Sequence, residues 1–159
     1  MLSQSNSDLS IPPSSSYWEC LNERSFSHSV KSPKVIETHI SCVLLTGKLA
    51  YKIKKPVNLG FVDYTTLEKR QHFCELEVEL NRRLSPDIYL GVVPILKHPH
   101  GFRVGDLVVK SEGKGDPPQR YGSPHLRSGS IVDYAVKMRQ FPQEAIIANR
   151  IKDPALTSR

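Results

Sequence analysis

The chain has 159 residues and a formal net charge of +6, with 38% hydrophobic and 24% charged residues. This balance is typical of a folded globular domain. No apolar run approaches the roughly 18 residues that a membrane-spanning helix needs, so no membrane partner is expected. Lys and Arg are spread along the chain, and a basic nucleic-acid-binding domain is therefore an alternative rather than the main expectation.

The N-terminal segment and the cysteines indicate the expected compartment. Residues 1–16, MLSQSNSDLSIPPSSS, lack the basic and apolar regions of a secretory signal and are predicted to form a disordered leader. Cys20, Cys42 and Cys74 are odd in number and have no metal-binding spacing. We therefore expect reduced thiols in a cytoplasmic protein.

The first half of the chain predicts a short helix and then strands. Residues 17–25 have the pattern of a short amphipathic helix. Residues 33–45 alternate as strands do, and after the turn at Thr46, Gly47 and Lys48 a second strand covers residues 49–53. Strands joined by a short turn that contains glycine are typical of a β-hairpin.

A long helix follows this predicted hairpin. Thr65 and Glu68 fit a capping box, in which each side chain binds a free backbone N–H, so a helix is expected over residues 66–84. The apolar residues that recur at helical spacing are expected to form its buried face; they are Phe73, Leu76, Leu80 and Leu84.

The second half of the chain predicts further strands and a loop. Their ranges are a strand at 88–97 interrupted near Pro94, a short hairpin at 101–109, a surface loop at 111–129, a strand at 131–138 and a helix that begins at 143. One dominant helix with segregated strands favours an α+β fold, with a mainly antiparallel sheet and the long helix packed on one face.

A lysine and a glutamate stand out within this arrangement. Strand alternation places Ala50 and Lys52 on one face, where a small side chain leaves room for a flat base and the lysine can reach phosphate oxygens. Glu77 falls within the apolar stripe of the helix, where a carboxylate is costly unless it is paired, whereas Glu75 falls on nearly the opposite side. The sequence thus predicts a Lys52–Glu77 ion pair. The alternatives are an exposed strand lysine and a glutamate that extends to water.

A third feature is the connection at residues 138–143, MRQFPQ, where a strand runs into a helix. Free backbone N–H and C=O groups in such a connection can pair with the edge of an adenine. An ordinary strand-to-helix loop is equally compatible with this sequence.

The stretch from Val35 to about Ile151 resembles the N-terminal domain of bacterial aminoglycoside-phosphotransferase-like proteins, which is often joined to a C-terminal ATP-binding domain. The resemblance rests on long phrases: IETHIS, LLTGKLAYKIKKPVNLGFVDYTTLEKR, CELEVELNRRLSPDIYLGVVPI and DYAVKMRQFPQ. It implies the small lobe of a protein-kinase-like fold at residues 17–142 and the start of a second lobe, cut short, at 143–159.

The resemblance also implies roles for individual residues. Lys52 would contact the phosphates of ATP, with magnesium present in the complete protein, and Glu77 would be its helix partner. Lys54 and Glu75 are the alternatives for these two positions. The adenine hinge would comprise Met138, Arg139 and Phe141.

The sequence departs from the family's pattern in ways that bear on activity. A glycine-rich phosphate loop is missing, and residues 37–41, ETHIS, occupy its place. Neither an H-x-D catalytic loop nor a second aspartate for magnesium can be placed. We therefore expect a lobe that is inactive alone, whose partners are a nucleotide and a missing C-terminal lobe or ATP-binding domain. An exposed apolar patch on its hinge side should favour self-association. The other alternative is a non-catalytic nucleotide-binding or interaction module.

Overall fold

The computed structural model describes residues 17–108 and 129–141. The predicted leader at 1–16, nearly all of the predicted loop at 111–129 and the predicted helix from 143 lie outside these residues. The described strands are β1 (Lys34–Glu37), β2 (Ser41–Leu45), β3 (Leu49–Lys54), β4 (Tyr89–His98), β5 (Gly101–Val104) and β6 (Ser130–Arg139), and the helix α1 covers Leu67–Arg82.

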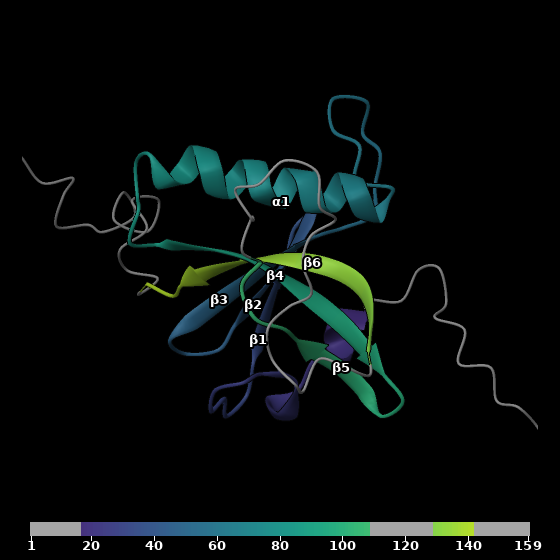
Figure 1. The fold of residues 1–159 in the computed structure, drawn as a ribbon, viewed down its shortest axis with the longest axis vertical. Helices are drawn as coiled ribbons and strands as arrows, with labels where there is room; N and C mark the ends of the chain where they lie inside the picture. Colours follow the sequence, from purple (N-terminus) through teal and green to yellow (C-terminus); the bar gives the residue numbers. More distant parts are fainter. Residues whose placement is uncertain (1–16, 109–128, 142–159) are drawn as a thin grey trace, which may run out of the picture.

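The six strands form one antiparallel sheet in the order β1-β2-β3-β6-β4-β5. The last of the described strands, β6, therefore lies between β3 and β4. The helix α1 connects β3 to β4 and lies across one face of the sheet (Figure 1). The predicted α+β fold, with a mainly antiparallel sheet and one long helix packed on it, is confirmed.

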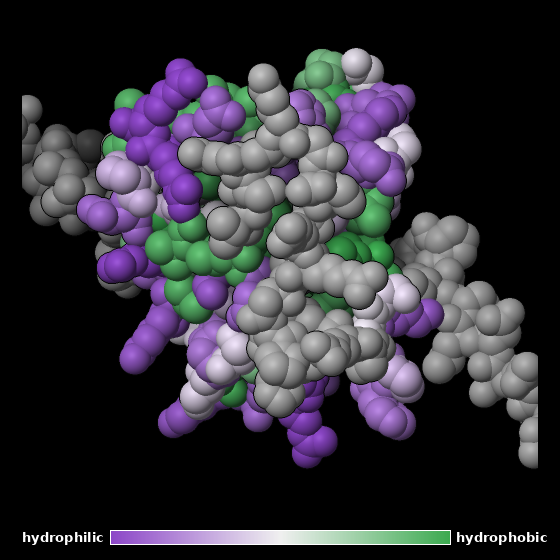
Figure 2. Space-filling view, in the orientation of Figure 1, coloured by the Kyte–Doolittle hydropathy of each residue, from purple (hydrophilic) through white to green (hydrophobic). Residues whose placement is uncertain are grey.

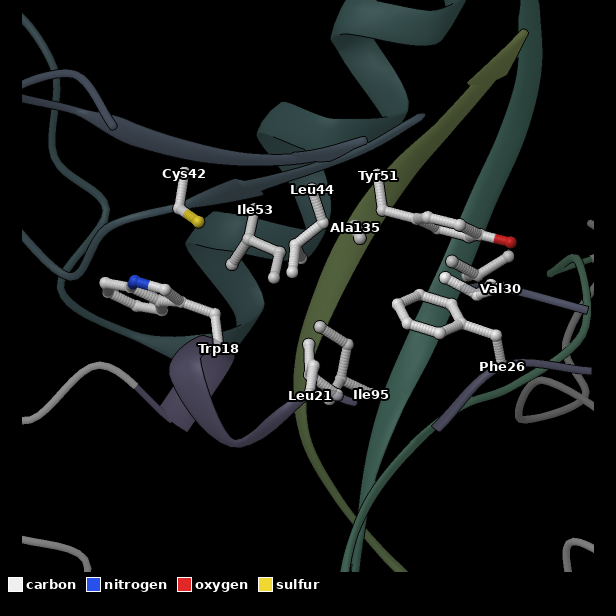
Figure 3. Close-up of a cluster of buried hydrophobic side chains, with 11 residues drawn as sticks. Trp18, Leu21, Phe26, Val30, Cys42, Leu44, Tyr51, Ile53, Ile95 and Ala135 are labelled. Atoms are coloured by element: carbon white, nitrogen blue, oxygen red, sulfur yellow. The ribbon is translucent and has the colours of Figure 1, made fainter. Parts of the chain in front are cut away.

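The N-terminal segment covers the opposite face of the sheet. Trp18 and Leu21 point toward Ile53 and Ile95, and all four side chains are buried in one apolar cluster (Figure 3). The predicted amphipathic helix at 17–25 is wrong in detail, because the segment consists of two 3₁₀ turns, Tyr17–Cys20 and Glu23–Ser25.

The side chain of Asn22 explains this break. Its Oδ1 accepts a hydrogen bond from the backbone N–H of Arg24, while Ser25 Oγ accepts one from the backbone N–H of Asn22. Reciprocal capping of this kind begins a new helical turn and so prevents one continuous helix.

The face of α1 that packs on the sheet differs from the predicted stripe. Its buried residues are Arg70, Cys74 and Val78, whereas Leu80 is exposed, and Leu84, which is 87% exposed, lies beyond the end of the helix. At about 100° per residue the buried line is roughly a third of a turn away from the predicted one. The prediction was wrong because the helix has apolar residues on several sides and the sheet covers one of them.

The start of α1 is also displaced by one residue. Thr66 caps the helix, and its hydroxyl accepts a hydrogen bond from the backbone N–H of Lys69. Thr65, the predicted member of a capping box, instead donates its hydroxyl to Asp63.

Strand β4 continues through Pro94 instead of ending there, and the predicted interruption corresponds to a register shift against β6 between Ile95 and Leu96. Proline lacks a backbone donor but keeps its acceptor, and Pro94 O accepts a hydrogen bond from the N–H of Gly105. The predicted hairpin at 101–109 is a single strand, β5, which pairs with β4 instead of with itself.

The connection between β3 and α1 projects from the body of the protein beside the helix (Figure 1). Asn58 and Asp63 form an isolated β-bridge, and Gly60 at the tip adopts φ of 81°, which glycine tolerates best. The turn holds Phe61 outward with 81% of its surface exposed. The tip of this loop is hydrophobic in the space-filling view, at the upper right of Figure 2.

Candidate functional site

Strand β3 directs its side chains alternately to the two faces of the sheet. Tyr51 and Ile53 are buried in the cluster beneath the N-terminal segment. Ala50 and Lys52 therefore face the helix side, as predicted. Across the strand pair they lie opposite Met138 and Val136 of β6, so the proposed hinge residue Met138 is a direct neighbour of Ala50.

The predicted Lys52–Glu77 ion pair is present. Lys52 Nζ donates to Glu77 Oε1 at 2.8 Å, and Lys54 Nζ donates to Glu77 Oε2 at 2.7 Å. The side chains of Lys52, Lys54 and Glu77 are 30%, 6% and 13% exposed, respectively. One helix carboxylate thus binds two lysines of the same strand, and we call these three residues the Glu77 cluster.

The electrostatic balance of the Glu77 cluster favours its charged forms. Burial by itself raises the pKa of Glu77, but hydrogen bonds from the two ammonium groups outweigh it and hold that pKa below its ordinary value. Burial likewise lowers the pKa of Lys54, and the hydrogen bond to Glu77 reverses this shift, so that its pKa lies above the ordinary value. Glu77 and Lys54 are therefore both charged at neutral pH.

Lys54 is held from a second side by aromatic packing. Its ammonium lies 5.0 Å from the centre of the Tyr64 ring, and the buried Tyr64 in turn packs edge-on against Phe73. Of the two candidate lysines, Lys52 has the partly exposed side chain, whereas that of Lys54 is buried.

Glu75, the alternative glutamate, does not contact either lysine. It accepts a hydrogen bond from the side chain of Gln71 at 3.1 Å and is half-buried, not fully in solvent as predicted. It lines a cavity of about 600 Å³ between α1 and β4, with Val78, Leu90 and Leu107 among the other walls. Neither Lys52 nor Glu77 lines this cavity, so it is separate from the predicted site.

The proposed hinge lies at the end of β6. The backbone N–H of Arg139 donates to Ile88 O, and that of Gln140 donates to Lys48 O, both at 2.9 Å. These two donors are engaged within the protein, so an adenine contact would have to use other groups of the connection. Phe141 is 45% exposed beside them.

The turn that takes the place of a phosphate loop is internally bonded. Thr38 Oγ1 and Ser41 Oγ lie 2.9 Å apart, and Thr38 Oγ1 also accepts from the N–H of Ser41. Glu37, at the end of β1, binds Lys55 Nζ at 2.6 Å. Both hydroxyls of this turn are therefore engaged within it.

A second charged cluster was not predicted from the sequence. Arg70 Nε donates to Asp133 Oδ1 at 2.8 Å, and the Tyr17 hydroxyl donates to Asp133 Oδ2 at 2.8 Å. The N–H of Tyr134 also donates to Oδ1. We call Tyr17, Arg70 and Asp133 the Asp133 cluster. Its sequence signal was an aspartate within the apolar run IVDYAV.

The described residues contain neither a cluster of metal-ligating side chains nor a helix that could span a membrane. In the described ranges, 17–108 and 129–141, no three His, Cys, Asp or Glu side chains gather as a metal site would require. Within those ranges the helix is also too short and too polar to cross a bilayer.

Comparison with known proteins finds similarity over part of the chain. A 75-residue segment is 44% identical to the uncharacterized protein Rv2004c of Mycobacterium tuberculosis and, to the same degree, to the uncharacterized protein Mb2027c of Mycobacterium bovis. That segment is 47% of this chain and spans 15% of the length of each relative. No family model and no solved structure matches the chain.

Proposed function

We propose that this chain is the ATP-binding small lobe of a kinase-like, aminoglycoside-phosphotransferase-like enzyme, and that it does not transfer phosphate by itself. The observation that carries the proposal is the 2.8 Å contact between Lys52 on the third strand and Glu77 on the helix that follows it. In kinases a lysine on the third strand contacts the nucleotide phosphates and pairs with a glutamate of the next helix.

The surroundings of Lys52 agree with such a role. Ala50 and Met138 lie side by side on the same face and give a small apolar surface next to the lysine. A planar base on that surface would leave its phosphates within reach of the partly exposed ammonium. Glu77 fixes the direction of the ammonium and so reduces the loss of side-chain entropy when a ligand binds.

Magnesium fits these residues less well than the nucleotide does. Glu77 already binds both lysines, so its oxygens are not available to a metal. Since the described residues gather no acidic cluster, the magnesium ligands and the aspartate that orients the acceptor would come from a second lobe. The relatives, of which the matched segment is 15%, are long enough to contain one.

Isothermal titration calorimetry with ATP tests the proposal. Wild type should bind ATP, and Lys52→Met should lower the affinity about tenfold or more, since a charge-assisted hydrogen bond to phosphate is lost. Lys34→Met is the matched control, because Lys34 lies exposed on β1 and its loss changes the net charge equally. Absence of heat up to millimolar ATP, or equal losses in both variants, would overturn the assignment.

A further inference from the structure

The Glu77 cluster contains more positive than negative charge. Glu77 is its single carboxylate and binds two ammonium groups, and within residues 17–108 and 129–141 no other carboxylate forms an ion pair with Lys52 or Lys54. The nearby Cys74 does not correct the imbalance, because burial raises the pKa of its thiol to about 12 and keeps it neutral. The three side chains of the cluster therefore have a net formal charge of +1.

The distribution of that charge follows from burial. Lys54 contacts both Glu77 and the Tyr64 ring, and its side chain is only 6% exposed. A buried ammonium needs a counter-ion more strongly than an exposed one does. Glu77 thus compensates mainly the charge of the buried Lys54, and the remaining positive charge lies on the partly exposed Lys52.

We propose that Lys54 is a positioning residue that neutralises Glu77, so that Lys52 keeps its positive charge for an anionic ligand of the polyphosphate class. Lys54 does not touch the ligand. It holds Glu77 Oε2, which turns Oε1 toward Lys52, and it prevents Lys52 and Glu77 from forming a closed neutral pair. The nucleotide identity of the ligand rests on the proposed function, whereas its negative charge follows from the charges within the cluster.

A charge-balance series separates this role from simple packing. Lys54→Met makes the Lys52–Glu77 pair neutral, and we expect affinity for sodium tripolyphosphate and for ATP to fall about tenfold at low salt. The double variant Lys54→Met with Glu77→Gln leaves Lys52 as the one charge of the cluster. It should regain part of that affinity, because the charge of Lys52 is no longer offset, although Glu77 no longer fixes the direction of its ammonium.

Calorimetric titration of each variant, after its folding has been checked by circular dichroism, gives the result. A packing role for Lys54 predicts that the double variant binds no better than Lys54→Met, and that outcome would overturn the proposal, as would unchanged affinity in Lys54→Met. If Lys54→Met does not fold, Lys54→Gln takes its place in the series. Lys54→Arg keeps the charge and should retain affinity in either case.

The two ligands keep this proposal distinct from the proposed function. Binding of tripolyphosphate with the expected rescue, but without a preference for ATP, would support the role of Lys54 and contradict the nucleotide assignment. Wild type that binds neither ligand would overturn both.

Discussion

The helix α1 is joined to the sheet by two charged clusters that differ in their charge balance and exposure. In the Asp133 cluster one carboxylate pairs with one guanidinium, and both side chains are nearly inaccessible. In the Glu77 cluster one carboxylate pairs with two ammonium groups, one of them partly exposed. The first is electrically balanced and closed, and the second is unbalanced and open on one side.

This difference separates two uses of buried charge. Asp133 accepts hydrogen bonds from Arg70 on the helix, Tyr17 in the N-terminal segment and the N–H of Tyr134, and so ties the two layers that cover the sheet to its central strand. A closed arrangement of this kind positions elements and leaves no group for a ligand. The Glu77 cluster, by contrast, leaves one ammonium group, that of Lys52, on a partly exposed side chain, and this is the group that we propose binds an anion.

The largest expected effect is on the closed cluster. Asp133→Ala should lower the free energy of unfolding by about 3–5 kcal/mol, because it leaves Arg70 buried without its counter-ion. Urea denaturation followed by circular dichroism measures the change. Glu79→Ala is the control, since it breaks the exposed Glu79–Arg83 pair and should cost less than about 1 kcal/mol. Equal effects of the two substitutions would contradict the distinction between the clusters.

Removal of the carboxylate from the open cluster should cost less. We expect Glu77→Gln to lower the free energy of unfolding by about 2 kcal/mol, because Lys54 loses its buried partner while the partly exposed Lys52 can turn to water. The same urea titration measures it. A loss as large as that of Asp133→Ala would show that the Glu77 cluster is equally closed.

The pH dependence should have opposite signs in the two clusters. The pKa of Glu77 is lowered on folding, so its stabilisation is present above its ordinary value of 4.5 and is lost as the pH falls through the lower folded value. Burial raises the pKa of Asp133 despite its pairing with Arg70, so ionisation of this carboxylate has a net cost, which is absent below its ordinary value of 3.8 and develops as the pH rises through the folded value. Between neutral and acidic pH, the urea midpoint of Glu77→Gln should therefore fall less than the midpoint of wild type.

Lys52→Met should have a small effect on stability. Because this ammonium is partly exposed, its loss is expected to change the free energy of unfolding by less than about 1 kcal/mol, even though it removes most of the affinity for polyphosphate. The unfolding and binding measurements on one sample test this. A large loss of stability would indicate that Lys52 acts mainly in folding.

The smallest expected change in the free energy of unfolding is for a substitution at Phe61, outside both clusters. Phe61→Ser should change the free energy of unfolding by less than about 0.5 kcal/mol, because the ring packs against little of the protein. Sedimentation velocity should show reduced self-association if the exposed tip contacts other copies. Identical sedimentation of both proteins at high concentration would argue against such contacts.

Short-range periodicity was sufficient to predict the Lys52–Glu77 contact. Strand alternation placed Lys52 on the helix side, and the helical wheel placed Glu77 near the buried face, although the apolar stripe itself was assigned a third of a turn away. Glu77 lies between the predicted and the observed stripes, so it faces the sheet in either case. That Glu77 would bind Lys54 as well as Lys52 was not predicted. Strand alternation puts both lysines on one face but does not indicate which of them the carboxylate reaches.

The Asp133 cluster could not be predicted in this way. Arg70 and Asp133 are 63 positions apart, and Tyr17 and Asp133 are 116 apart, so no local pattern relates them. They come together because β6 lies in the middle of the sheet, and this position is not evident from the order of the strands in the sequence. The nucleotide role of Lys52, Ala50, Glu77, Met138, Arg139 and Phe141 stays a prediction.

The central position of β6 also bears on how the protein acquires its structure. Strands β3 and β4 each have one unpaired edge until β6 inserts between them, and on a ribosome β6 emerges after the other five described strands. Until then the nascent chain presents two open strand edges, which other chains can pair with. The interval between the synthesis of β4 and the arrival of Ser130–Arg139 is thus the period in which this protein is most exposed to aggregation, and chaperone binding should be concentrated there.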